Sequence, residues 1–296
     1  MKKRLIGSSL LAVAAGVGGK VYQEAYQYGK KVGYRSSFAD NEDAILENDD
    51  MKKIKIKNHK GLLLQGYLLE KENADKTVLV VHPFNQSAVI MEPYVEYFDH
   101  LLGNVNILLI DANAHGNSDG YIRGFGYRDV TDLMYWNTYL LQKYGDDHSI
   151  IMYGLEMGAN TILNAAGMLK LKNVKVIISE GAFDNVYYYL AYSFAKNKKT
   201  MHLVAPIIRG AIKDELNYDI KGMNTVELVK NNEIPTIFIH SKADKKVDFN
   251  CVLELFNNSG SEKELFPIKE NYLFELEGLN DDYSKTVNAY IKRHCQ

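Results

Sequence analysis

The chain has little of what specialised scaffolds require. Among its 296 residues only two are cysteines, Cys251 and Cys295, which excludes a disulfide framework, and neither has metal-ligand spacing. Charge of either sign is not in excess, because 35 Lys and Arg face 37 Asp and Glu. Nucleic-acid binding is therefore not expected, since contacts to phosphates need a cationic surplus. No repeat or low-complexity tract is present, and 46% hydrophobic residues indicate an enzyme-sized globular domain without cofactor or metal motifs.

The N-terminus carries a long charge-free run. Basic residues at positions 2–4 precede Leu5–Gly19, and Lys20 follows. The run is shorter than the roughly 20 residues that span a bilayer. It is similar to a signal peptide with Ala12-Val13-Ala14 as a cleavage site. We expect residues 1–20 to be an anchor or signal, with the main domain outside the cell membrane; if they form only a surface helix, the protein is cytoplasmic.

The remainder divides into a short leader and one large domain. Residues 21–50 are polar and predict a helix followed by a linker. From residue 51 to 296 the pattern is that of a globular domain. Met51–Asn58 alternates apolar and charged residues and pairs with Gly61–Lys71 as a predicted hairpin.

Further strands are predicted where short apolar runs are rich in β-branched residues. These runs are Thr77–His82, Asn106–Asp111, Ser149–Tyr153, Val174–Ser179 and Pro235–His240. The last strand is read as Lys263–Lys269 or, in a different register, as Tyr272–Glu277. Helical patterns such as Val130–Tyr144 and Ala159–Leu171 lie between them, and Asp281–Arg293 closes the chain. The order predicts an α/β fold with a mostly parallel sheet of about eight strands flanked by helices. Residues 182–233, between two strands, predict an inserted helical cap.

Functional residues in such sheets follow the carboxyl ends of strands. There the chain reads DANAHGNSDG at 111–120, GLEMGA at 154–159 and IPTIFIHSKAD at 234–244. These motifs resemble the α/β-hydrolase superfamily, specifically its serine aminopeptidase/esterase-like branch, from Met51 to the C-terminus. The branch pattern D-x-R-G-H-G-x-S-x-G is altered here, since Asn113 and Ala114 replace its arginine and glycine.

The resemblance implies a degenerate catalytic triad. Glu156 occupies the serine position of the nucleophile elbow, and Asp244 occupies the acid position. The family histidine would fall near Leu273 or Asn280, and no histidine occurs from residue 241 to 293. The oxyanion hole would use the amides of Met157 and Phe84, because Pro83 has no N–H. Ser-His-Asp catalysis is therefore not available to this chain.

The elbow carboxylate of Glu156 admits several roles. It could be a covalent nucleophile, a general base that activates water, or a ligand-binding group. We favour a structural role, in which it accepts the two oxyanion-hole amides at the helix N-terminus. Other candidate residues are expected to serve packing and loop structure: His82, His115, Ser118, His240 and Cys251.

Three functions remain open. The leading hypothesis is a non-catalytic homologue that binds a small molecule or a protein partner at the cleft and the cap. The aromatic cap residues suit either a ligand or cap packing: Tyr187, Tyr188, Tyr189, Tyr192 and Phe194. The alternative is an ester or amide hydrolase that uses Glu156, with Asp244 in support. A purely structural domain would have its cleft filled by side chains, whereas a binder would show a cavity bordered by Phe84, Glu156 and Asp244.

Overall fold

The computed structural model describes residues 18–35, 46–269 and 281–295. Most of the expected N-terminal segment, and both candidate histidine positions, 273 and 280, lie outside these ranges. None of the helices within them is long and apolar enough to cross a membrane.

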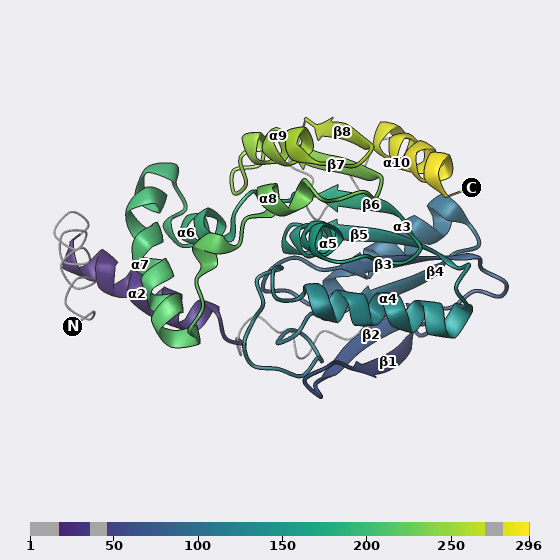
Figure 1. The fold of residues 1–296 in the computed structure, drawn as a ribbon, viewed down its shortest axis with the longest axis horizontal. Coiled ribbons are helices and arrows are strands. Elements are labelled where there is room, and N and C mark those ends of the chain that lie inside the picture. The colour runs from purple at the N-terminus through teal and green to yellow at the C-terminus, as the bar shows by residue number, and fades with distance from the viewer. Residues whose placement is uncertain (1–17, 36–45, 270–280, 296) are drawn as a thin grey trace.

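A single twisted sheet forms the centre of the molecule (Figure 1). In the described residues it has eight strands in the order β1-β2-β4-β3-β5-β6-β7-β8. Strand β2 pairs antiparallel with both β1 and β4, and the pairs from β4 to β8 are parallel. This confirms the expected mostly parallel sheet. The strands are β1 (Lys52–Lys57), β2 (Leu63–Leu69), β3 (Lys76–Val81), β4 (Asn106–Ile110), β5 (Ser149–Leu155), β6 (Val174–Glu180), β7 (Thr236–Ser241) and β8 (Lys263–Ile268).

Helices cover both faces of the sheet, so its central strands are apolar on both sides. On β3, Val78 and Val80 pack toward one face, while Leu79 and Val81 pack toward the other. The first face is covered by the 3₁₀ helix η1 (Ala88–Met91), α3 (Pro93–Leu102) and α10 (Asp281–His294). The second is covered by α4 (Val130–Tyr144), α5 (Met157–Met168), α8 (Thr225–Val229) and α9 (Phe249–Asn258).

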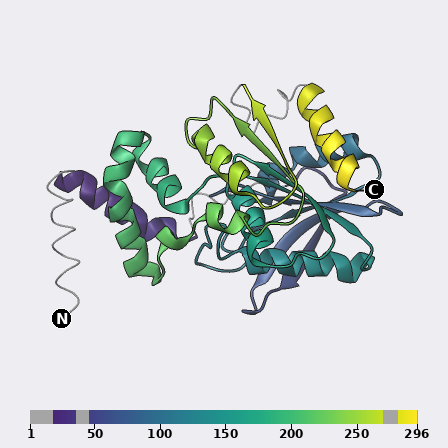
Figure 2. The same ribbon diagram turned by 45° about the horizontal axis from the view of Figure 1, so that its top comes forward.

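The segment between β6 and β7 forms a helical layer beside the carboxyl ends of the strands. It contains α6 (Val186–Ala195), α7 (Lys198–Leu216) and the short 3₁₀ helix η2 (Ile220–Gly222) before α8. Figure 2 shows α6 and α7 grouped apart from the sheet, together with the N-terminal α2 (Gly19–Val32). Their apolar side chains form a separate core that also includes Met157 and Val247 from the sheet side.

The helix expected within residues 21–50 is α2, and it packs on α7, which the sequence did not predict. A Cβ on Gly29 would lie 2.7 Å from the Ala211 Cβ and 2.8 Å from the Ile208 carbonyl oxygen. Glycine at this position therefore lets the two helices approach closely. After α2, the Gly33 carbonyl accepts a 2.8 Å hydrogen bond from the Arg123 amide, which ties the chain to the sheet domain.

Candidate site at the elbow and the cap

The turn from β5 into α5 holds Glu156 in a strained conformation. Its φ of 54° and ψ of −110° are rare for a residue with a side chain. A Cβ on Gly154 would lie 2.5 Å from the Ala159 amide nitrogen, and one on Gly158 would collide with the Val81 carbonyl. The two flanking glycines thus let the chain reverse sharply, and the turn presents Glu156 beyond the end of β5.

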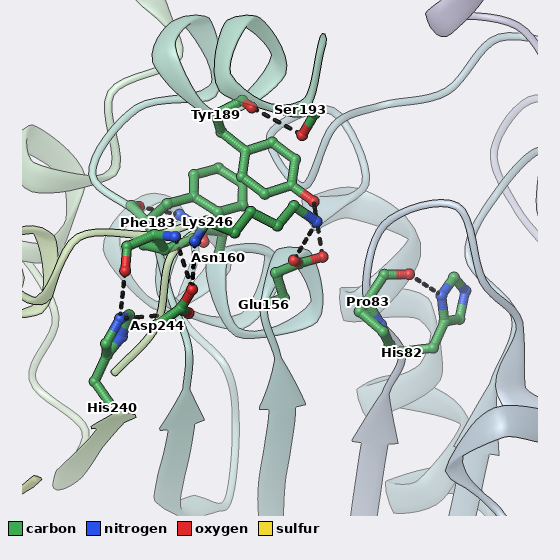
Figure 3. A network of polar contacts seen from close by, with 11 residues as sticks. His82, Pro83, Glu156, Asn160, Phe183, Tyr189, Ser193, His240, Asp244 and Lys246 are labelled. Atoms are coloured by element: carbon green, nitrogen blue, oxygen red, sulfur yellow. Dashed lines mark hydrogen bonds and ion pairs between the residues drawn. The ribbon is translucent and has the colours of Figure 1, made fainter. Parts of the chain in front are cut away.

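The Glu156 carboxylate is buried, with the residue 3% exposed, and it is fully engaged. The Lys246 ammonium donates to Oε1 at 2.5 Å, and the Tyr189 hydroxyl donates to Oε2 at 2.7 Å. The Lys246 Nζ also lies 2.7 Å from the Tyr189 hydroxyl, which closes a three-membered network (Figure 3). Burial and the adjacent carboxylate hold the pKa of Tyr189 well above its usual range, so its hydroxyl remains a donor.

The expectation that Glu156 caps its own helix is wrong. Its side chain makes no hydrogen bond to the first turn of α5 and instead bonds to Tyr189 of α6 and to Lys246. A cation and a phenol stabilise a buried carboxylate more strongly than helix amides that it would have to reach by folding back. In the described part of the chain, the amides of Met157 and Phe84 have no hydrogen-bond acceptor. Their role as oxyanion-hole donors stays a prediction.

Asp244 shapes the loop that presents Lys246. Its Oδ1 accepts the backbone amides of Lys246 at 2.7 Å and Val247 at 3.0 Å. Its Oδ2 is buried, 3.7 Å from Nε2 of His240, which in turn lies 3.0 Å from the Val247 carbonyl oxygen. Asp244 therefore fixes a turn, and its assignment to the acid position stays a prediction. Burial lowers the pKa of the neighbouring His240.

The histidines and serine near the strand ends have structural partners. The Ala112 amide donates to Nε2 of His82, so Nδ1 carries the proton that bonds to the Pro83 carbonyl at 2.8 Å. Burial lowers the pKa of His82 to about 4, so the ring is neutral at physiological pH. Ser118 donates to the Asp111 carbonyl and accepts from the Gln65 amide, as a loop residue does.

A cavity of about 210 Å³ lies beside this network, between α6, α7 and the start of α9. Its apolar wall consists of Phe183, Tyr188, Tyr189, Tyr192, Met201 and Val247. Phe84, Glu156 and Asp244 do not line this cavity. It is therefore a different cavity from the one expected between these three residues. Tyr189 and Lys246 contact Glu156 and also line the cavity, and they separate the elbow from it.

Comparisons with known proteins bear on the fold. No protein-family model matches the chain. The structure of esterase Pf2001 from Pyrococcus furiosus superposes with a TM-score of 0.68 at 18% identity, covering 86% of this chain and 96% of that one. The chain has the α/β-hydrolase fold.

Two further proteins are similar to this chain. A Pyrococcus horikoshii acylaminoacyl peptidase shares the α/β-hydrolase fold at a TM-score of 0.60 and 16% identity, over 82% of this chain and 41% of the peptidase. The uncharacterized protein YqkD of Bacillus subtilis (strain 168) is 24% identical over 234 residues, which are 78% of this chain and 76% of YqkD.

Sequence reasoning missed Lys246, which no α/β-hydrolase motif marks. The loop also carries Lys242 and Lys245, and the pattern does not distinguish the three lysines. A buried carboxylate at the elbow needs a cation nearby. The three lysines follow β7, which lies two strands from β5 in the sheet, so they were the candidates for that cation. The cap aromatics divide between the two expected roles: Tyr188 and Tyr192 line the cavity, while Phe194 packs on Tyr28 with ring centroids 5.3 Å apart.

Within the ranges that the structure describes, no three His, Cys, Asp or Glu residues are grouped so that they could hold a metal ion. Cys251 lines the cavity, and burial raises the pKa of its thiol to about 12. At neutral pH this thiol is protonated and is a poor nucleophile or metal ligand.

Proposed function

We propose that this chain is a non-catalytic α/β-hydrolase-fold protein that binds a small molecule in the cavity beside the cap. The observation that carries the proposal is the Glu156 carboxylate, which stands in the nucleophile position with both oxygens engaged by Lys246 and Tyr189. In this role Glu156 is an anchor between the elbow, the cap and the loop after β7.

The contacts of Glu156 weigh against the hydrolase alternative. To attack a carbonyl or to take a proton from water, the buried carboxylate would have to leave its ion pair with Lys246, whose side chain is 39% exposed, at a cost of about 1 to 3 kcal/mol. An acyl-enzyme would then need a base to activate water. Among the described residues, no histidine forms a hydrogen bond or ion pair with the Glu156 side chain, and His82 and His240 bond to backbone carbonyls.

The cavity supports the binding role. Aromatic walls with a few polar groups are typical of small-molecule sites. Its volume of about 210 Å³ is below the range of sites for drug-sized ligands and suits a smaller molecule. We also propose that residues 1–20 attach the domain to the outer face of a membrane, which the charge-free run after basic residues 2–4 supports.

Hydrolysis of short-chain p-nitrophenyl esters tests the proposal. The full chain should show no turnover above that of Glu156→Ala or the isosteric Glu156→Gln. The matched control is Glu227→Ala, which removes an exposed carboxylate on α8. Turnover by the wild type that both Glu156 variants abolish and Glu227→Ala retains would overturn the non-catalytic role.

Membrane attachment has a separate test. Cell fractionation should find the full chain with membranes and should find the chain lacking residues 1–17 in the soluble fraction. This truncation retains α2, which packs on the cap. Equal partitioning of the two proteins would contradict the attachment.

A further inference from the structure

The charged groups that line the cavity leave one carboxylate without a counter-ion. Lys198 pairs with Asp248, and Lys246 pairs with Glu156. Asp184, on the same wall, forms no ion pair with any residue that the structure describes. Its Oδ1 accepts a hydrogen bond from the Asn185 amide at 2.8 Å, and the Cys251 thiol also hydrogen bonds to the carboxyl group. Both lysines of the lining are therefore paired with other carboxylates, and Asp184 is the lining carboxylate that no described cation pairs with.

The environment of Asp184 favours a cation as the missing partner. Burial raises the pKa of its carboxyl group, because few water molecules solvate the ionised form. A cation in the cavity would supply the stabilisation that water does not. His202 also lines the cavity, and its ring packs edge-on against Tyr188 at 5.4 Å between centroids.

The aromatic wall adds a second attraction for a cation. The Lys246 ammonium already lies over the Tyr189 ring, 4.6 Å from its centroid. Tyr188 is 40% exposed, and Tyr192 also lines the cavity. Ring faces attract cations through their quadrupole, and most strongly where water is excluded.

From this arrangement we infer that the cavity binds a small organic cation, an ammonium or quaternary ammonium group that carries an apolar substituent. The positive charge lies against Asp184 and the Tyr188 ring, and the substituent lies among Phe183, Met201 and Val247. The inference rests on the proposed binding function and names its ligand class.

Isothermal titration calorimetry with the full chain tests the inference. The probe is phenyltrimethylammonium, and the comparison ligands are its uncharged isostere tert-butylbenzene and the anion benzoate. The cation should bind at least about tenfold more tightly than either. Asp184→Asn should weaken cation binding by about tenfold, and Tyr188→Leu by about threefold. Asp147→Asn, at an exposed position outside the cavity, should leave it unchanged.

Several results would overturn the inference. Equal binding of the cation and the isostere would do so, as would unchanged affinity in Asp184→Asn or an absence of cation binding. If Asp184→Asn fails to fold, Tyr188→Leu decides, because its half-exposed ring is not required by the core. Tight binding of tert-butylbenzene without a preference for the cation would reject the ligand class and keep the binding function. Ester turnover that depends on Glu156 would reject the binding function itself.

Discussion

The elbow at Glu156 and the loop at Asp244 follow β5 and β7, and they are held in place in different ways. The elbow has a strained backbone between two glycines, with an acidic side chain at its centre. The loop is held by the Asp244 side chain, whose Oδ1 accepts the amides of the turn that positions Lys246. The two positions remain connected, because Lys246 bonds to Glu156.

The difference is that the backbone fixes one region and a side chain fixes the other. The elbow conformation persists because the backbones of α5 and β3 touch at Gly158 and Val81. Its strain is compensated by the packing of the whole sheet, whatever side chain stands at the centre. At Asp244 the side chain holds the loop, because its Oδ1 accepts the Lys246 and Val247 amides.

The largest expected effect comes from the elbow backbone. Gly158→Ala should destabilise the protein by about 4 kcal/mol or more, because its Cβ would collide with the Val81 carbonyl. Chemical denaturation measures the loss. The control, Gly210→Ala in α7, places a Cβ in open space and should be neutral or slightly stabilising. Similar stability of the two variants would show that packing does not maintain the elbow.

The next effect tests the link between the two regions. Lys246→Met should cost about 3 kcal/mol of unfolding free energy, because it leaves the buried Glu156 carboxylate without its cation. Adding Glu156→Gln should recover most of the loss, and Lys245→Met, at an exposed position, is the control. The pairing would be refuted as a stabilising contact if Lys246→Met unfolded at the wild-type urea concentration.

A smaller, pH-dependent effect comes from a carboxylate that lacks such a cation. Burial raises the pKa of Asp129 to about 7. Its Oδ2 accepts the Gly126 amide at 2.8 Å. Because the folded-state pKa is above the unfolded value, stability should fall as pH rises toward 7.

The variant Asp129→Asn isolates the contribution of this carboxyl group to the pH dependence of stability. Between pH 5 and pH 7, the wild type should lose about 2 kcal/mol relative to Asp129→Asn. Thermal unfolding at a series of pH values measures the difference, with Asp146→Asn as an exposed control. Parallel pH profiles of wild type and Asp129→Asn would contradict the raised pKa.

Most of the sheet could be predicted from the sequence because its cause is local. Strands buried on both faces read as continuous apolar runs, and Val130–Tyr144 has the bounds that its pattern predicts. The packing of α2 on α7 could not be predicted in this way. It depends on a close approach at Gly29 and Ala211, and the residue pattern of one helix does not indicate that it packs on the other.

The same distinction holds at the site. Motif spacing located Glu156 and Asp244 at the ends of their strands, because the turn chemistry there is local. The partners of Glu156 come from positions 33 and 90 residues away in the chain. Their selection from many tyrosines and several lysines depends on tertiary geometry, and it changes the role of Glu156 from helix cap to ion-pair partner.

The position of α2 also has a mechanical consequence. The helix packs on α7, and only after it does Arg35 donate to the Ser118 carbonyl at 2.7 Å and join the loop that follows β4. A pulling force on the N-terminus therefore loads the interface of α2 with the cap before it reaches the sheet. In a force-extension experiment, the first rupture should detach α2 and strip one wall from the cap while the eight strands stay paired.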